Sequence, residues 1–221
     1  MRLYVAYSLL WKTSELWVSF DRYGLKPPQG ESSQGLSLHV DQNPAVHPNF
    51  QTIQAVVALT DCPEVRGTFV AVPGSVAKFK EYMKYIKPGY VGEYVELQDS
   101  YLKEEMSLNK QLIALRQGHL VAWDSRLTHA NSSNISNQNR YVAYISAGIA
   151  KKDPALIEQR LTHYESGLGV NLRDAYMHAS KKPRFSSVEF NQKLRDGNSE
   201  KLTFLGQLLY GLKKYSEGSN V

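Results

Sequence analysis

A histidine and an aspartate separated by one residue occur in the segment Leu38-His39-Val40-Asp41-Gln42. Residues two positions apart on a β-strand point to the same side, so the imidazole of His39 and the carboxylate of Asp41 would lie next to each other. Such a pair supplies two of the three ligands of a facial iron(II) site. The motif alone is not specific, because it also arises by chance and fits a salt-bridged surface pair.

A third ligand is available further along the chain, where the apolar run Leu120–Trp123 leads into a polar turn that presents His129. Arg140 follows at the start of the next apolar run. A metal held by three side chains keeps open positions that a 2-oxo acid such as 2-oxoglutarate can fill. A guanidinium can then hold the far carboxylate of that molecule through two parallel hydrogen bonds. Taken singly, His129 also fits a hydrogen-bonded turn, and Arg140 fits a surface ion pair.

Short β-rich runs separated by turn residues must position these groups. The runs are Leu16–Phe20, Leu36–Val40, Thr52–Leu59, Gly67–Val72, Leu120–Trp123 and Tyr141–Ile149. Glycine, proline and serine predict a loop from Gly24 to Gly35. Helices are expected in residues 1–16, Lys78–Ile86, part of Tyr101–Leu115, after Asp153-Pro154 and at Phe204–Leu212. This spacing predicts a mainly β sandwich, barrel or jelly roll.

The 221 residues fit a single domain. We expect a lead-in at 1–35, a core with the metal site at 36–150, and a helical or loop extension at 151–221. No apolar run approaches the roughly 20 residues of a membrane span. Cys62 is the only cysteine and no signal-peptide pattern opens the chain, which favours an intracellular, cytoplasmic protein. The net charge of +5 is dispersed, so it indicates a modest Lys/Arg excess more than an acidic or nucleic-acid partner.

Several stretches together resemble the phytanoyl-CoA dioxygenase-like branch of the Fe(II)/2-oxoglutarate oxygenases. In chain order they are Leu38–Pro44, Gln54–Asp61, Gly67–Ser75, Trp123–His129 and the segment from Asn134 to Arg140-Tyr141. The resemblance covers residues 36 to 150 and depends on the joint pattern. It implies a double-stranded β-helix (a cupin-like jelly roll) with flanking helices.

The resemblance also implies roles for individual residues. His39, Asp41 and His129 would bind iron(II), Arg140 would hold the C5 carboxylate of 2-oxoglutarate, and Gln54 would lie near the cosubstrate. The reaction implied consumes O2 and 2-oxoglutarate, releases succinate and CO2, and oxidises a C–H bond. Because the Asp41 carboxylate is kept, hydroxylation is favoured over halogenation. A small-molecule substrate is expected.

Three positions depart from the family pattern. Val76 follows Ser75 where a histidine is common, and His119 stands where an aspartate is common. Val142 occupies a position that often carries a hydroxyl group, which leaves room for a catalytically inactive relative serving as a binding module. Two further alternatives stay open: a cupin-type enzyme that does not use 2-oxoglutarate, and an oxygenase acting on a nucleic acid or a protein.

Other residues near the motifs receive structural interpretations. His47, between two prolines, is read as a loop residue. Asp124 and Arg126 flank the predicted site and could orient its ligands or form an ordinary hairpin ion pair. Trp123 and Phe69 are expected in the core and not in a substrate box.

Overall fold

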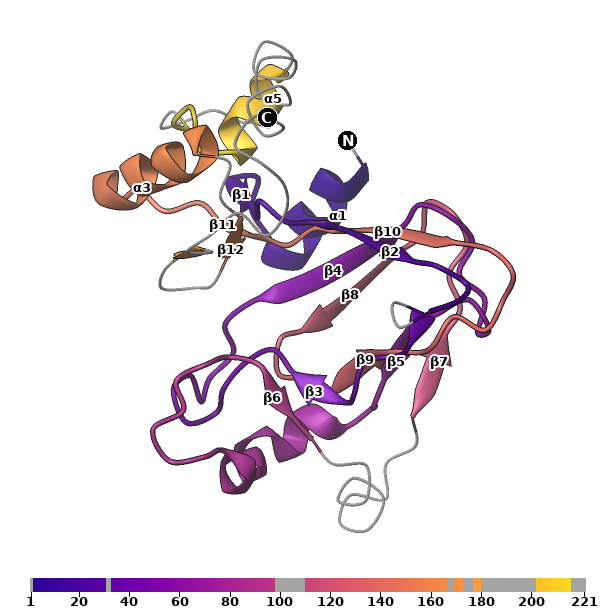
Figure 1. The fold of residues 1–221 in the computed structure, drawn as a ribbon. Helices are drawn as coiled ribbons and strands as arrows, with labels where there is room; N and C mark the ends of the chain where they lie inside the picture. Colours follow the sequence, from indigo (N-terminus) through magenta and orange to yellow (C-terminus); the bar gives the residue numbers. More distant parts are fainter. Residues whose placement is uncertain are drawn as a thin grey trace. The chain divides into compact units, whose positions relative to one another are not determined.

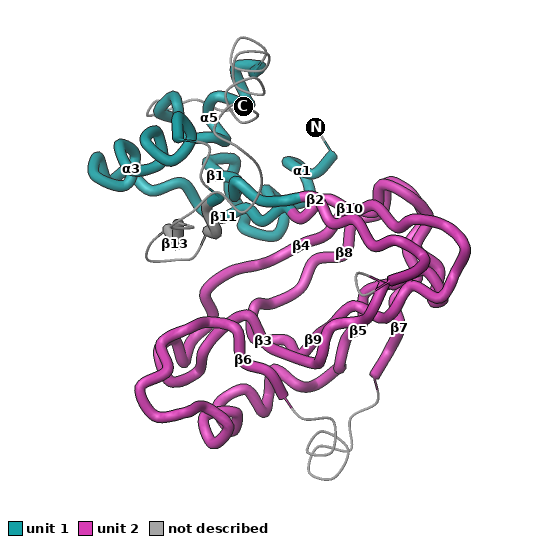
Figure 2. The backbone as a smooth tube through the Cα atoms, in the orientation of Figure 1, with its two compact units in different colours: residues 1–22, 145–221 teal, residues 23–144 magenta. Residues whose placement is uncertain are grey.

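The computed structural model describes residues 2–30, 33–97, 110–166, 169–172, 177–179 and 202–215. The chain divides into two compact units, Tyr23–Tyr144 and a second made of Met1–Arg22 with Ile145–Val221 (Figures 1 and 2). The first contains the core expected from residue 36 onward, but residues 145–150 belong to the second. This division does not test whether the chain folds as one domain, which stays a prediction.

Two antiparallel sheets build the unit Tyr23–Tyr144, and they form its two layers (Figure 1). In spatial order, the strands of this unit in the first sheet are β2 (Tyr23–Lys26), β10 (Arg140–Tyr144), β4 (Ile53–Ala58) and β8 (Leu120–Asp124). Those of the second are β6 (Val95–Glu96), β3 (His39–Val40), β9 (His129–Asn131), β5 (Phe69–Ala71) and β7 (Gln111–Ile113). The predicted mainly β double-stranded β-helix, or jelly roll, is therefore confirmed.

Side-chain alternation gives the second sheet two different faces. One face packs on η2 (Ser75–Tyr85), a 3-10 helix, and its cluster includes Val40, Val70, Ala130, Phe79 and Tyr82. The residues before Val70 and Ala130, which are Phe69 and His129, therefore point the other way, toward the first sheet. There Phe69 packs in a cluster with Val56, Trp123 and Val142. The ligand-bearing face is thus the inner face of the jelly roll.

One sequence-based expectation for secondary structure is wrong, and another is largely untested. The expected loop Gly24–Gly35 begins inside strand β2, which pairs with β10. The Tyr23 and Leu25 side chains of β2 are exposed, so this strand lacks the apolar content that marks the others. Most of the expected helix Tyr101–Leu115 lies outside the described residues, and its described part forms strand β7. Pairing of β2 with the sequence-distant strand β10 outweighs the loop signals in Gly24–Gly35.

In its described residues, the second unit combines helices with two pairs of short strands. Its elements are α1 (Arg2–Trp11), β1 (Leu16–Val18), β11 (Ala147–Ile149), α3 (Pro154–Glu165), β12 (Val170–Leu172), β13 (Met177–Ala179) and α5 (Phe204–Leu209). β1 pairs with β11, and the Trp11 indole of α1 donates to the carbonyl oxygen of Ala147 over 2.8 Å. Within the described parts of the chain, no helix has the length and apolar character to cross a membrane.

The start of helix α3 follows the sequence-based prediction and can be tested. The Asp153 carboxylate accepts a hydrogen bond from the backbone N–H of Ala155 over 2.9 Å, and Pro154 occupies the first turn. We expect Asp153→Ala to lower the free energy of unfolding by about 1 kcal/mol, because an orphan N–H loses its acceptor. Asp153→Asn should retain most of the stability. Urea unfolding followed by circular dichroism measures both, and an unchanged Asp153→Ala would contradict the cap.

Candidate metal centre

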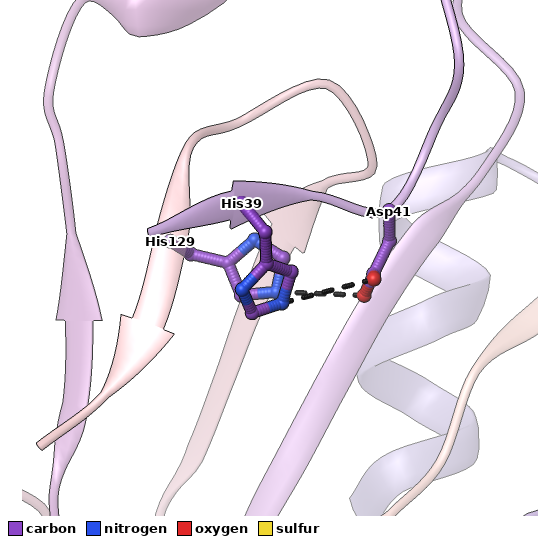
Figure 3. Close-up of side chains that lie close together, drawn as sticks. All are labelled: His39, Asp41 and His129. Carbon is purple, nitrogen blue, oxygen red and sulfur yellow. Dashed lines mark ion pairs between the residues drawn. The ribbon is translucent and has the colours of Figure 1, made fainter. Parts of the chain in front are cut away.

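Three side chains converge on the inner face of the second sheet. His39 on β3 and His129 on β9 are register partners across neighbouring antiparallel strands, and Asp41 follows directly after β3. Their ligand atoms all lie within 4.8 Å of one another. The Asp41 carboxylate faces both imidazoles, with Oδ1 3.7 Å from Nε2 of His39 and Oδ2 3.5 Å from Nε2 of His129 (Figure 3). The structure thus brings together the three ligands that the sequence predicted.

Backbone carbonyl groups hold both imidazoles in the orientation that metal binding needs. Nδ1 of His39 lies 2.7 Å from the carbonyl oxygen of Ser37, and Nδ1 of His129 lies 2.9 Å from that of Leu127. Since a carbonyl oxygen only accepts, the ring proton belongs on Nδ1 in each case. The lone pair of Nε2 then points into the space between the three ligands. This is the arrangement through which proteins fix the tautomer of a metal-binding histidine.

The charges at the site also suit a cation. Burial acts to raise the pKa of the Asp41 carboxyl, but the hydrogen bond and charge of His129 and the charge of His39 outweigh it and hold this pKa well below its ordinary value. Burial, together with the charge of His129, lowers the pKa of His39. At neutral pH the site therefore has an ionised carboxylate and a neutral His39, the protonation states required of metal ligands. Two imidazoles and one carboxylate fit iron(II).

Gln54 contacts the metal centre through Asp41. Its amide nitrogen on β4 donates to Oδ2 of Asp41 over 3.0 Å, while its amide oxygen is buried without a hydrogen-bond partner. The sequence-based role near the cosubstrate stays a prediction. The observed contact instead orients a ligand, and the unpartnered oxygen leaves an acceptor free at the same place.

This contact makes Gln54→Leu informative. We expect the substitution to weaken metal binding about tenfold, because partners of metal ligands typically contribute 10- to 100-fold to affinity. Calorimetric titration with manganese(II), an oxygen-stable substitute for iron(II), measures the change. Gln111→Leu, at an exposed glutamine of β7, is the matched control. If Gln54→Leu and the control bind equally well, the hydrogen bond to Asp41 has no role in holding the metal.

The chain after Asp41 is fixed by a buried glutamine. The Gln42 amide donates to the carbonyl oxygens of His47 and Asn49 and accepts from the Ser125 hydroxyl. His47 is a loop residue, as the sequence predicted, and its Nε2 lies 3.1 Å from a carboxylate oxygen of Glu93. It is not among the three converging ligands. These contacts fix the backbone that carries Asp41.

Arg140 is buried in the same unit without an anion. Only 2% of its surface is exposed; one terminal nitrogen donates to the Asn131 amide oxygen over 3.1 Å, and Nε has no partner. No carboxylate of the described residues forms an ion pair with it. A surface ion pair, the plainer interpretation of Arg140, is therefore excluded for the described chain. A buried guanidinium with an unpartnered N–H group is able to donate a hydrogen bond to a bound carboxylate.

The aromatic residues form both the core and the wall of the site. Trp123 and Phe69 belong to the core cluster, as predicted, and their rings lie 5.1 Å and 5.6 Å from the His129 ring. Among the described residues, the buried Trp123 indole N–H has no hydrogen-bond partner, which the sequence did not indicate.

Asp124 and Arg126 form an ion pair beside the site. The Asp124 carboxylate accepts two hydrogen bonds from the Arg126 guanidinium, over 2.7 Å and 3.0 Å. This pair is thus the hairpin ion pair that the sequence left open.

One residue near the site had no signal in the sequence. The Tyr94 ring lies 4.6 Å from the His39 ring and is partly exposed. Burial and the charges of Glu96 and Asp41 raise the pKa of its hydroxyl. Tyr94 therefore keeps its proton at neutral pH and places a neutral aromatic group beside the metal ligands. It stands in a stretch without a motif, so only the folded chain could reveal it.

The fold and the three converging side chains define a jelly-roll protein with a His–Asp–His group that could hold a metal ion. A family model described as phytanoyl-CoA dioxygenase (PhyH) matches residues 6–142, which is more than half of the chain. The chain therefore belongs to this family. The position of the three ligands inside the matched region agrees with the resemblance found in the sequence.

Solved structures are similar to this chain at low sequence identity. The epimerase SnoN in complex with Fe3+, alpha ketoglutarate and nogalamycin RO is 20% identical, with a TM-score of 0.50 over 67% of this chain and 56% of that one. EctD from S. alaskensis with bound Fe is 16% identical, with a TM-score of 0.45 over 61% and 45%. The chain covers only part of the proteins it matches: 26% of EvdMO1, 56% of SnoN and 49% of AviO1. A search of curated proteins gave no match.

Proposed function

We propose that this chain is a dioxygenase that depends on iron(II) and 2-oxoglutarate and hydroxylates a C–H bond of a small molecule. The observation that carries the proposal is the presence, in one unit, of a His–Asp–His group and a buried Arg140 that has no counter-ion among the described residues. A metal site alone fits many reactions, but a buried guanidinium without a counter-ion indicates a carboxylate ligand. Membership of the PhyH family supports the same assignment.

The spacing along strand β9 suits a short diacid. His129 and Asn131 are two residues apart on this strand, so their side chains share a face and lie roughly 6.5–7 Å apart along it. Arg140 is hydrogen-bonded to Asn131. A cosubstrate bound to the metal through its 2-oxo acid end could therefore extend along β9 and place its far carboxylate at Arg140. That separation is comparable to the length of 2-oxoglutarate.

The roles of the side chains follow from their contacts. His39, Asp41 and His129 would hold iron(II), which when bound supplies the activation of O2 coupled to conversion of 2-oxoglutarate to succinate and CO2. One oxygen atom of O2 enters succinate, and the other enters the substrate as a hydroxyl group. Arg140 binds and orients the cosubstrate. The rings of Phe69 and Trp123 exclude water on the side of His129.

Hydroxylation of a small molecule is the finer part of the proposal. The Asp41 carboxylate occupies the ligand position that halide would need, which disfavours halogenation. SnoN is an epimerase, so a similar fold can serve a reaction other than hydroxylation. The binding-module alternative remains motivated by Val142, which is fully buried in the apolar core cluster. That side chain gives Arg140 no hydroxyl neighbour at this position.

Turnover of 2-oxoglutarate tests the proposal directly. The protein loaded with iron(II) is mixed with 2-oxoglutarate without oxygen, and the metal-to-ligand charge-transfer band reports binding. Oxygen is then admitted with a panel of small molecules, nucleic acids and peptides, and succinate is measured by mass spectrometry. We expect succinate in excess of a His129→Ala control, increased by at least one small molecule. Binding without any succinate would favour the binding-module alternative, and a nucleic acid or peptide as sole stimulator would overturn the substrate class.

A further inference from the structure

A small cavity with a basic lining lies within the second unit. Its volume is about 150 Å³, and it is lined by residues around β1, between β11 and the first turn of α3, and just after α5. Most of these residues, from Ala150 to Tyr215, follow the region 6–142 that the family model matches. None of them belongs to the metal centre. Neither membership of the PhyH family nor the proposed function accounts for this cavity.

Positive charge dominates the lining of this cavity. Four lysines contribute to it, Lys151, Lys152, Lys213 and Lys214, whereas Glu15 is the one acidic residue among the described lining residues. In the described ranges, no carboxylate forms an ion pair with Lys152, Lys213 or Lys214. Cations gathered around a concave, partly apolar wall focus the electric field and raise the local concentration of anions. The charge of the cavity therefore favours an anionic ligand.

The aromatic wall of the cavity is held in place and has one unused donor. Trp17 on β1 is buried, and the Arg160 guanidinium stacks on its ring, 4.8 Å from the ring centroid. Arg160 also donates to the carbonyl oxygen of Val18 over 2.8 Å, which ties α3 to β1. A Cβ added at Gly211 would lie 3.3 Å from the indole nitrogen, so this edge of the ring lies beside another lining residue. The indole N–H, which can only donate, has no acceptor among the described residues.

We infer that this cavity binds the phosphate group of a small phosphorylated molecule. Its volume of about 150 Å³ is below the roughly 300–1,000 Å³ of pockets for drug-sized ligands, so it suits one compact charged group. A phosphate monoester carries close to two negative charges near neutral pH, and lysines bind phosphate as point charges. The apolar surface of Trp17 and Ile157 would contact the carbon atoms next to the phosphate. This inference is independent of iron and 2-oxoglutarate.

The test measures binding of phenyl phosphate to the full manganese(II)-loaded chain by calorimetry at about pH 7.5, where the phosphate is a dianion. Phenyl sulfate, which has nearly the same shape and a single charge, is the comparison ligand. For the wild type we expect phenyl phosphate to bind at least about fivefold more tightly than phenyl sulfate, because each added charge gains from the clustered lysines. The affinity for phenyl phosphate should fall as the salt concentration rises.

Paired lysine variants separate the cavity from the net charge of the protein. Lys152→Gln with Lys214→Gln should weaken phenyl phosphate binding by about tenfold or more, because two uncompensated cations of the lining are lost. Lys80→Gln with Lys87→Gln removes two exposed lysines of the other unit and should stay within about twofold of the wild type. Both double variants have the same net charge, so general attraction of anions affects them alike. Circular dichroism checks that both are folded.

A second titration, in the presence of saturating 2-oxoglutarate, shows where phenyl phosphate binds even if the variants fold poorly. Unchanged affinity supports the cavity, whereas competition places the phosphate at the metal centre and overturns the inference. No binding by the wild type at about 10 mM, or equal affinity in the two double variants, also overturns it. Binding to vesicles of phosphatidylserine without binding to phenyl phosphate would assign the lysines to a lipid surface instead of a small molecule. None of these outcomes bears on the proposed function.

Discussion

Replacing His129 by alanine should reduce manganese(II) or iron(II) affinity by more than about 100-fold, because loss of a ligand exceeds the 10- to 100-fold cost of losing a ligand's partner. The same holds for His39→Ala. Both imidazoles present Nε2 toward Asp41, with Nδ1 held by a backbone carbonyl oxygen. No other side chain in the described residues joins the ligand group to replace either one. Calorimetry without oxygen measures the loss.

His47→Ala is the matched control for this prediction. His47 is also a histidine of the same unit, but its imidazole is held by the Glu93 carboxylate and lies outside the ligand group. We expect its loss to leave metal affinity within about threefold of the wild type, since the Gln42 amide still fixes the loop. If His39→Ala binds metal as tightly as the wild type, the ligand assignment is wrong. If His47→Ala abolishes binding, the loop contributes a ligand in solution.

The proximity of the three proposed ligands could be predicted from the sequence, in part because local geometry places two of them together. Side chains two residues apart on a strand share a face, and His39 and Asp41 remain on one side although β3 ends at Val40. Predicting the position of His129 required long-range information, because only the pairing of β9 with β3 brings it opposite His39. The order of the family motifs supplied that long-range information.

The surroundings of the site could not be predicted in the same way. Lys26 stands beside Pro27 and Pro28, which favoured a loop, and its strand exists because it pairs with β10. Tyr94 and the indole N–H of Trp123 depend on side-chain directions set by distant strands. Asp124 and Arg126 were open to two interpretations, which only the observed ion pair could separate. Contacts between sequence-distant strands thus carry the information that local patterns lack.

Lys26, the register partner of Arg140 across strands β2 and β10, is a second cation buried in the same unit. Two buried cations without a carboxylate partner among the described residues disfavour the unliganded state, and a bound anion relieves this unfavourable burial of charge. Binding of 2-oxoglutarate should therefore raise the thermal midpoint of the metal-loaded protein, because a ligand that binds only the folded state stabilises it by RT ln(1 + [L]/Kd). This rise in the thermal midpoint should be smaller when either cation is removed. An ion pair that stabilises the fold would instead affect the thermal midpoint of the unliganded protein.

Among the variants of the two cations, Arg140→Ala should show the largest loss of 2-oxoglutarate affinity. Removing one partner from a buried, hydrogen-bonded charge pair costs on the order of 3 kcal/mol, so 2-oxoglutarate affinity should fall by roughly 100-fold or more. Metal affinity should stay near that of the wild type, because Arg140 contacts Asn131 and none of the three ligands. Arg140→Lys should lie between, since an ammonium keeps the charge and loses the fork. The charge-transfer band of the iron(II) complex, titrated with 2-oxoglutarate without oxygen, measures all three proteins.

Arg116→Ala, at an exposed arginine of the same unit, is the control and should leave the titration unchanged. The unliganded thermal midpoint of Arg140→Ala should change less than the ligand-induced rise, because the substitution removes an uncompensated buried charge along with its single hydrogen bond to Asn131. Equal 2-oxoglutarate affinity in Arg140→Ala and the wild type would place the anchor elsewhere, and Lys26 would be the next residue to test. A wild type that binds no 2-oxoglutarate at millimolar concentration would instead remove the cosubstrate from the proposal, since two buried cations would then have to serve a different anion.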